Sequence, residues 1–244
     1  MSPEKKHTNE GFPSIHEGLV GWSSPSNIAL VKYWGKRSPQ LPMNANLSMT
    51  LQEAFTATKV HFRKKPTGGL KWVFRFEGEE APEFHPKIQA FFNKVRDTLN
   101  IFHENVSLEI ESSNTFPHSS GIASSASAMS ALALCLVEID QIIGNQQSED
   151  EEFFRLASEI ARIGSGSASR SVYPGYAIWG ETEIVPSSSD LYAVPFSNMV
   201  HPFFQQLIDD ILIVSSSKKS VSSSAGHGLM ENHPYAESRY KQAA

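Results

Sequence analysis

The residues best suited to chemistry lie in loops rich in serine and glycine. The longest of these, residues 114–128, reads Asn-Thr-Phe-Pro-His-Ser-Ser-Gly-Ile-Ala-Ser-Ser-Ala-Ser-Ala. Alternating apolar and polar residues at 106–110 predict a strand before it, and small and apolar residues at 122–139 predict a helix after it. The first N–H groups of a helix lack partners and its dipole favours negative charge, so this order suits a phosphate. The alternative is a serine-capped helix that packs closely on a sheet.

A second loop, residues 162–170, reads Arg-Ile-Gly-Ser-Gly-Ser-Ala-Ser-Arg. Gly164 and Gly166 permit unusual backbone angles, and Arg170 offers a planar fork for a carboxylate or a phosphate. The loop is not a dinucleotide-binding fingerprint, because Ser169 stands where the third glycine would be and no strand is predicted before it. The alternative is a flexible connector, although the arginine that closes the run argues against a plain linker.

A lysine interrupts the apolar run at 28–34, which predicts a mostly buried strand. Burying an unpaired ammonium is costly, so Lys32 either extends to the surface or is held for a purpose. Lys36 and Arg37 follow a glycine and could simply be solvated. A third serine-rich segment, 220–226, is either a surface turn or part of the same site. The cations and the polar loops together indicate a polyanionic ligand such as a nucleotide or a diphosphate.

The composition excludes several classes of function. A net charge of −5 gives no electrostatic footprint for nucleic acid, so any anion site must be local. Cys135 is the only cysteine, which excludes a disulfide framework and favours a reducing compartment. No stretch reaches the roughly 18 unbroken apolar residues of a membrane span, and the first ten residues lack the apolar core of a signal peptide. The nine histidines show no metal-binding spacing, and His118 in the first loop is ambiguous.

Predicted strands outnumber helices early in the chain and the two types mix later, which indicates an α+β fold. We expect a turn at 24–27, and strands at 28–34, 47–51, 56–62, 70–76, 106–110, 172–179 and 211–215. We expect helices that begin at Pro86, at 122 and after a Ser148 cap, the last of these ending at Gly164, with further helices at 201–208 and 235–244. An exposed loop is expected at 181–192.

Four runs resemble the diphosphomevalonate decarboxylase family of the GHMP kinase superfamily. They are Asn-Ile-Ala-Leu-Val-Lys-Tyr-Trp-Gly-Lys-Arg at 27–37, the first loop at 114–126, the second loop at 162–171 and Val-Ser-Ser at 221–223. The runs follow the family's order from about residue 20 to 230. The resemblance implies a two-lobe α+β GHMP kinase fold with a ribosomal protein S5 domain 2-like N-terminal lobe and the site in the cleft between the lobes. It divides the chain into a loose leader at 1–18, the N-terminal lobe at 19–206 and the start of the C-terminal lobe at 207–244.

The resemblance implies ATP-dependent decarboxylation of mevalonate 5-diphosphate to isopentenyl diphosphate, ADP, phosphate and CO2, with Mg2+ as cofactor. It also implies a cytoplasmic homodimer with small-molecule ligands and no nucleic-acid or membrane partner. Two alternatives stay open. One is a related kinase of a mevalonate derivative that does not decarboxylate, and the other is a non-catalytic anion-binding or assembly domain.

Residue roles also follow from the resemblance. Catalytic roles fall on Lys32, Arg170, Ser124 and Ser125, with Ser124 or Ser125 near Mg2+. The ATP phosphates would lie against Pro117, Ser119, Ser120, Gly121, Ile122, Ala123, Ser124, Ser125 and Ala126. The substrate would contact Asn27, Lys32, Tyr33, Trp34, Lys36, Ser165, Gly166, Ser167, Arg170 and Ser222. Arg170 would bind the substrate carboxylate or the nearby catalytic group.

One departure from the family pattern matters. The family's catalytic aspartate lies in an Asp-Ala-Gly-Pro-Asn-like run far downstream, and the sequence contains no Asp-Ala and no Gly-Pro pair. We therefore expect the second lobe to be largely missing, whether the chain is a fragment or a degenerate homologue. Such a chain should be inactive by itself and should expose apolar surface where the second lobe would pack.

Overall fold

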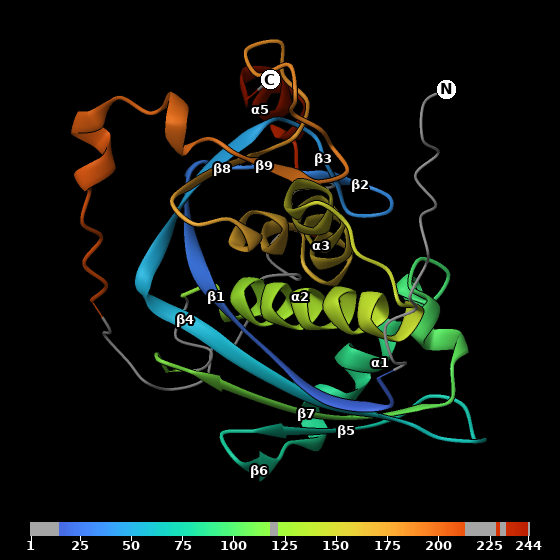
Figure 1. The fold of residues 1–244 in the computed structure, drawn as a ribbon. Coiled ribbons are helices and arrows are strands. Elements are labelled where there is room, and N and C mark those ends of the chain that lie inside the picture. The colour runs from blue at the N-terminus through green and yellow to red at the C-terminus, as the bar shows by residue number, and fades with distance from the viewer. Residues whose placement is uncertain (1–14, 118–121, 213–227, 230–232, 244) are drawn as a thin grey trace, which may run out of the picture.

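A computed structural model describes residues 15–117, 122–212, 228–229 and 233–243. A seven-stranded sheet forms one layer, and helices α1 (His85–Val95), α2 (Ser124–Gly144) and α3 (Asp150–Gly164) cover one of its faces (Figure 1). This confirms the predicted α+β class.

The sheet has the order β6-β5-β7-β4-β8-β9, and β1 pairs with β4 off this path. Its strands are β1 (Glu17–Val31), β4 (Asn46–Lys64), β5 (Lys71–Phe76), β6 (Glu79–Glu80), β7 (Val106–Asn114), β8 (Tyr176–Trp179) and β9 (Ala193–Pro195). Strands β2 (Lys36–Arg37) and β3 (Leu41–Pro42) form a separate small hairpin. The strands predicted at 70–76 and 106–110 are confirmed.

The longest strands differ from the prediction. The two strands expected at 47–51 and 56–62 are one continuous strand, β4, because β1 pairs with it antiparallel from Glu17 to Val31. The turn expected at 24–27 is wrong, since those residues lie inside β1. The register of β1 against β4 shifts between Pro25 and Asn27, and such an irregularity accommodates the missing N–H of proline.

The segment 28–34 is not the buried strand that we expected. Strand β1 ends at Val31, and Leu30 and Val31 are 49% and 47% exposed. The strand expected at 172–179 begins only at Tyr176, because residues Gly166–Val172 form a 3-10 helix. The predicted loop at 181–192 is confirmed apart from one isolated bridge between Thr182 and Val185.

The predicted helices at Pro86, 122–139 and 235–244 are confirmed as α1, α2 and α5 (Ala236–Ala243). Helix α3 ends at Gly164 as predicted, but its cap is Glu149. Ser148 does not cap it and instead accepts a hydrogen bond from the Gln141 side chain at 2.6 Å. Further 3-10 helices cover Pro82–Phe84, Asn100–His103, Ser197–Met199 and Pro202–Gln206, the last where a helix was expected at 201–208.

Helix α2 forms the centre of the core. By length and composition alone it could cross a membrane, yet 72% of its most apolar window is buried inside the protein. Leu134, Leu136 and Ile139 belong to one buried cluster with sheet residues that include Val60 and Leu108. A fully buried leucine or phenylalanine contributes about 1.5–3 kcal/mol, so this interface dominates the stability of the fold.

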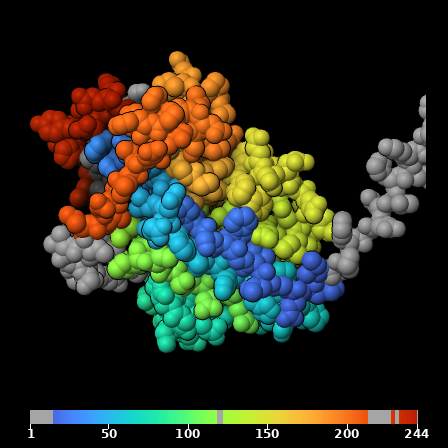
Figure 2. Space-filling view, turned by 60° about the vertical axis from the view of Figure 1, so that its left-hand side comes forward, coloured from blue at the N-terminus to red at the C-terminus, as the bar shows by residue number. Residues whose placement is uncertain are grey.

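Beyond β9 the chain runs over the surface, where the orange segment up to residue 212 lies across one end of the molecule (Figure 2). Ile208 and Leu212 are 86% and 88% exposed, as expected for the region where a second lobe would pack. Ile211 and Leu212 are not in a strand, and the rest of the strand predicted at 211–215 lies outside the described residues, as does the leader up to residue 14.

Candidate functional site

Arg170 is the buried cation around which the candidate site is built. It lies in the 3-10 helix that follows α3, and only 1% of it is exposed. Its Nη1 donates to Asn46 Oδ1 and its Nη2 to Asn27 Oδ1 at 3.3 Å, while Nε has no hydrogen-bond partner. None of the ion pairs between described residues involves Arg170. Burial lowers its pKa to about 10, because no carboxylate offsets the desolvation of the guanidinium.

A buried guanidinium held only by neutral amides leaves a positive potential that an anion can satisfy. Because Arg170 is almost fully covered, direct contact with a ligand requires the residues above it to move. Its electrostatic effect requires no such movement, since the field is weakly screened in a buried environment.

Asn27 joins β1 to the second loop. Its Nδ2 donates to Ser171 Oγ at 2.7 Å and to the Ser167 carbonyl at 3.1 Å, and its Oδ1 accepts from Ser48 Oγ at 2.9 Å. The side chain is buried, so its amide is engaged by the protein itself. In this arrangement Asn27 fixes the guanidinium of Arg170, whereas the sequence predicted a contact with substrate.

Two aromatic rings flank the guanidinium. Tyr33 and Trp179 meet edge to face with their centroids 5.2 Å apart, and the Arg170 guanidinium carbon lies 5.9 Å and 5.8 Å from their centroids. Gly166 makes this packing possible, because a Cβ there would lie 2.9 Å from the Trp179 ring and 3.5 Å from the Tyr33 hydroxyl oxygen. Burial raises the pKa of Tyr33, so the phenol stays protonated at neutral pH.

The predicted lysines lie at the surface. Lys32 is exposed, and its Nζ donates to the Ala29 carbonyl at 3.2 Å, which agrees with the alternative that it extends to solvent. Lys36 is exposed at the start of the β2–β3 hairpin, and the neighbouring Arg37 forms an ion pair with Asp190. Both side chains are therefore accessible to an anion from solvent.

The N-terminus of α2 lacks a side-chain cap. Its N-cap residue, Ala123, has φ of 50°, and no serine hydroxyl takes the capping position, so the expectation of a serine-capped helix is wrong. Ser26 Oγ donates to the Ile122 carbonyl and fixes the end of the loop. An uncapped helix start with small side chains suits phosphate oxygens.

The first two loops meet at a pair of hydroxyls. Ser125 Oγ lies 3.4 Å from Ser165 Oγ, which brings the start of α2 beside the end of α3. Of the other residues expected at the ATP phosphates, Pro117 is exposed, whereas Ile122 and Ala126 are buried. Ser119, Ser120, Gly121 and Ser222 were also predicted and lie outside the described residues, as does His118.

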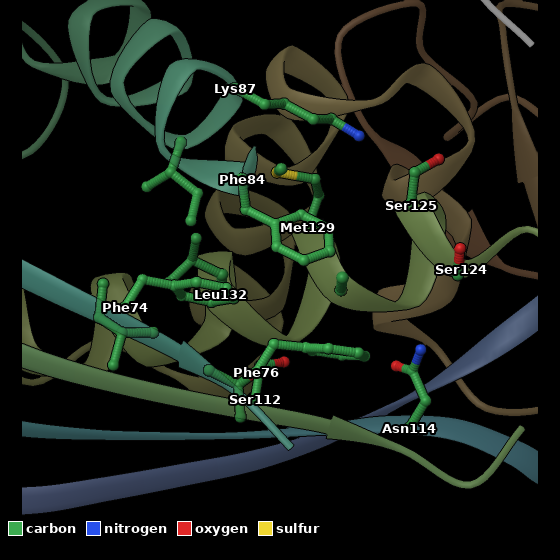
Figure 3. Close-up of a pocket in the computed structure, with 14 residues that line it drawn as sticks. Phe74, Phe76, Phe84, Lys87, Ser112, Asn114, Ser124, Ser125, Met129 and Leu132 are labelled. Carbon is green, nitrogen blue, oxygen red and sulfur yellow. The ribbon is translucent and has the colours of Figure 1, made fainter. Parts of the chain in front are cut away.

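An apolar pocket of about 80 Å³ opens beside the start of α2 (Figure 3). Phe74, Phe76, Phe84, Met129 and Leu132 give it apolar walls, and Ser112, Asn114, Ser124 and Ser125 add polar groups. The side chain of Lys87 extends from α1 toward Ser125. Although Lys87 is partly exposed, burial around its ammonium lowers its pKa.

Sequence analysis missed this pocket. Phe74 and Phe76 were recognised only as one face of a strand, and Lys87 follows the proline that opens α1 without any motif of its own. The walls come from β4, β5, β7, α1, α2 and the 3-10 helix at Pro82–Phe84, so no local pattern marks them.

The described residues of the site offer hydroxyl groups, and no acidic cluster, to a metal ion. No group of three or more His, Cys, Asp or Glu side chains suited to a metal occurs among the described residues. Mg2+ is commonly held through substrate phosphates and few protein ligands, and the Ser124 and Ser125 hydroxyls at the α2 N-terminus fit that role.

Comparisons with a family model and with curated proteins point to the same family. Residues 24–192 match the family model described as the diphosphomevalonate decarboxylase-like N-terminal domain. Over 223 residues the chain is 33% identical to diphosphomevalonate decarboxylase of Bos taurus, covering 85% of this chain and 52% of that protein. The Ganoderma lucidum protein of the same name is 32% identical, with 90% and 55% coverage. The chain thus spans about half the length of these curated relatives.

Solved structures agree in fold. The crystal structure of mevalonate diphosphate decarboxylase from Staphylococcus aureus matches with a TM-score of 0.68 and 31% identity, over 93% of this chain and 64% of that one. A structure described as MDDEF in complex with MVAPP, AMPPCP and magnesium matches with a TM-score of 0.64 and 28% identity, over 93% and 64%. These matches confirm the GHMP-type fold with part of the second lobe absent from the aligned region. Since the family model covers most of the sequence, the chain belongs to the diphosphomevalonate decarboxylase family.

Proposed function

We propose that this protein acts in the ATP-dependent decarboxylation of mevalonate 5-diphosphate to isopentenyl diphosphate. The observation that carries the proposal is Arg170, a buried guanidinium with amide partners and no acidic one among the described residues. It lies in the loop that also brings Ser165 to the start of α2. A cation so placed can stabilise a carboxylate or a transferring phosphoryl group in weakly screening surroundings.

The nucleotide would occupy the side of the site formed by α2. Its phosphates would lie against the uncapped N–H groups of the helix, and its base or ribose would lie in the pocket walled by Phe74, Phe76 and Phe84. Lys87 would supply positive charge between the two. The AMPPCP and magnesium complex of a related protein supports ATP and Mg2+ as ligands of this family.

The substrate would occupy the side formed by Arg170, Tyr33 and the exposed lysines Lys32 and Lys36. Transfer of the γ-phosphoryl group to the tertiary hydroxyl requires positioning and charge neutralisation more than covalent participation by the protein. The phosphate then leaves as the C–C bond to the carboxylate breaks, and that electron pair forms the new double bond as CO2 departs. Ser165 and Ser167 would align the reacting end of the substrate, while Mg2+ would neutralise phosphate charge beside Ser124 or Ser125.

Calorimetry with the ATP analogue and Mg2+, and separately with mevalonate 5-diphosphate, tests the assignment. We expect both ligands to bind, and neither to displace the other, because they use different sides of the site. Absence of binding of mevalonate 5-diphosphate would contradict the proposal. Release of CO2 on addition of ATP separates a decarboxylase from a kinase that only phosphorylates a mevalonate derivative.

A second candidate is a non-catalytic anion-binding domain. The Arg170 guanidinium and the start of α2 could hold anions without turnover, and no carboxylate among the described residues forms an ion pair with Arg170. Binding of both ligands with no formation of ADP or CO2 would support this candidate, and turnover would exclude it. The homodimer and the cytoplasmic location remain parts of the proposal, and light scattering tests the first of them.

A further inference from the structure

Helix α5 lies against the segment that carries Tyr33. The guanidinium of Arg239 stacks over the Trp34 ring at 4.7 Å from its centroid. The Tyr240 ring fills the space above Gly35, where an added Cβ would lie 2.8–2.9 Å from three of its atoms. In Figure 1 α5 and the β2–β3 hairpin, which begins one residue after Gly35, lie toward the same end of the molecule.

The opposite side of the same segment is held by Asn44. The Trp34 N–H donates to Asn44 Oδ1 at 3.1 Å, and Asn44 Nδ2 donates to the Lys32 carbonyl at 3.0 Å. The Gly35 carbonyl accepts from the Met43 N–H at 3.0 Å. Residues 32–35 are therefore held on one side by the loop before β4 and on the other by α5. We call this pair of contacts the grip.

Gly35 is required for space and not for backbone freedom. It is absent from the glycines with positive φ, so an alanine would adopt its backbone conformation without strain. The three atoms nearest to an added Cβ all belong to Tyr240, so the cost of a side chain at this position would come mainly from that ring. This makes the contact between α5 and the segment testable by substitution at either partner.

Tyr33 lies within the gripped segment and has its ring against Trp179 and Arg170. We infer that Arg239 and Tyr240 are positioning residues that fix residues 32–35, and with them Tyr33 and Lys32, for binding of the diphosphate substrate. The inference about the substrate rests on the proposed function, whereas the grip itself does not. The C-terminal helix would thus complete the substrate side of the site without touching the reacting atoms.

The first test needs no ligand. Amide hydrogen exchange of the full 244-residue chain should show faster exchange of the Trp34 N–H in Arg239→Ala, by about threefold to tenfold, as expected for loss of a cation–π contact. Arg239→Lys should recover part of the protection, because an ammonium can also lie over the ring. Lys241→Ala is the matched control, since Lys241 is on the same helix but pairs with Glu237 at 2.9 Å.

The second test uses the proposed ligands. Arg239→Ala should weaken binding of mevalonate 5-diphosphate by a similar factor and leave binding of the magnesium complex of the ATP analogue unchanged, because the nucleotide uses α2. Gly35→Ala should lower the unfolding midpoint. In a chain that already carries Tyr240→Ala, Gly35→Ala should lower the midpoint much less, because the ring that the added methyl group meets is gone.

Equal Trp34 exchange in Arg239→Ala and Lys241→Ala would overturn the grip, as would strict additivity of the Gly35 and Tyr240 substitutions. If the grip responds as expected and wild-type protein binds the substrate, unchanged substrate affinity in Arg239→Ala would overturn the positioning role. Failure of the wild-type chain to bind mevalonate 5-diphosphate would instead contradict the proposed function, and the exchange data would still decide the grip.

Discussion

Arg170 Nη2 lies 3.3 Å from Asn27 Oδ1, although 143 positions separate the two residues in the chain. The contact joins β1 to the loop after α3 and turns a buried cation toward the aromatic pair Tyr33 and Trp179. Arg162, eight residues earlier, is also buried but donates to backbone carbonyls of Pro39 and Leu191, both at 2.6 Å. Arg170 thus keeps an unpaired Nε–H among the described residues, whereas Arg162 joins two loops through their backbone carbonyls.

Substitution of these two arginines should therefore have opposite consequences. Arg170→Ala should raise the dissociation constant for mevalonate 5-diphosphate by about 30-fold or more, because loss of a buried charge partner costs about 2 kcal/mol or more. Its effect on folding should be smaller, since removing an uncompensated buried charge offsets part of the lost packing. Calorimetry and urea unfolding measure the two effects.

Arg162→Ala serves as the matched comparison. It removes charge-assisted hydrogen bonds to the Pro39 and Leu191 carbonyls at about 1.5–3 kcal/mol each, so unfolding should shift strongly while substrate affinity of the folded protein stays near the wild-type value. A larger loss of affinity in Arg162→Ala than in Arg170→Ala would contradict the assigned roles.

Lys87 should matter for the nucleotide and not for the substrate. We expect Lys87→Ala to weaken binding of ATP by about tenfold, as for a lost charge-assisted contact with phosphate, and to leave mevalonate 5-diphosphate affinity unchanged. Lys94→Ala is the control, because Lys94 is exposed in the last turn of the same helix. Equal nucleotide affinity in the two variants, measured by titration, would remove Lys87 from the site.

Gly166 should tolerate no side chain. An added Cβ would lie 2.9 Å from the fully buried Trp179 ring, so Gly166→Ala should destabilise the protein by about 1–3 kcal/mol through overpacking. Gly228→Ala, where no atom lies within 4 Å of the added group, should have little effect. Urea unfolding followed by tryptophan fluorescence compares the two variants. Equal midpoints would show that the residues around Trp179 accommodate the added methyl group without loss of stability.

Cys135 should make the free energy of unfolding depend on pH in the alkaline range. Burial raises the pKa of its thiol to about 12, whereas an unfolded cysteine titrates near roughly 8.5. Between these values the unfolded state loses the proton and the folded state keeps it, so the free energy of unfolding should fall as pH rises through that window. Cys135→Ala should reduce this slope in urea unfolding curves measured from pH 8 to pH 11. An identical slope in the variant would show that other groups account for the loss.

The sequence by itself determined the family, the α+β class, the central helix and the loops that carry hydroxyls and cations. These features are local: the apolar period of α2, the start of α1 at a proline and the runs at 27–37 and 162–171 are each read within a few residues. Arg170, Tyr33 and Gly166 were found this way, and the structure brings them together. The catalytic and binding roles given to the site residues stay predictions.

Tertiary structure alone decided which partners these residues have. The pairing of β1 with β4 on both sides of Pro25 overrode the turn signal there, and Leu30 and Val31 are exposed at the strand end. Asn46 beside Arg170 and Arg239 over Trp34 come from segments distant in the chain, which no local period connects. Side-chain identity fixed what chemistry was available, and long-range packing fixed where each charge is buried, because burial depends on neighbours that only the folded chain supplies.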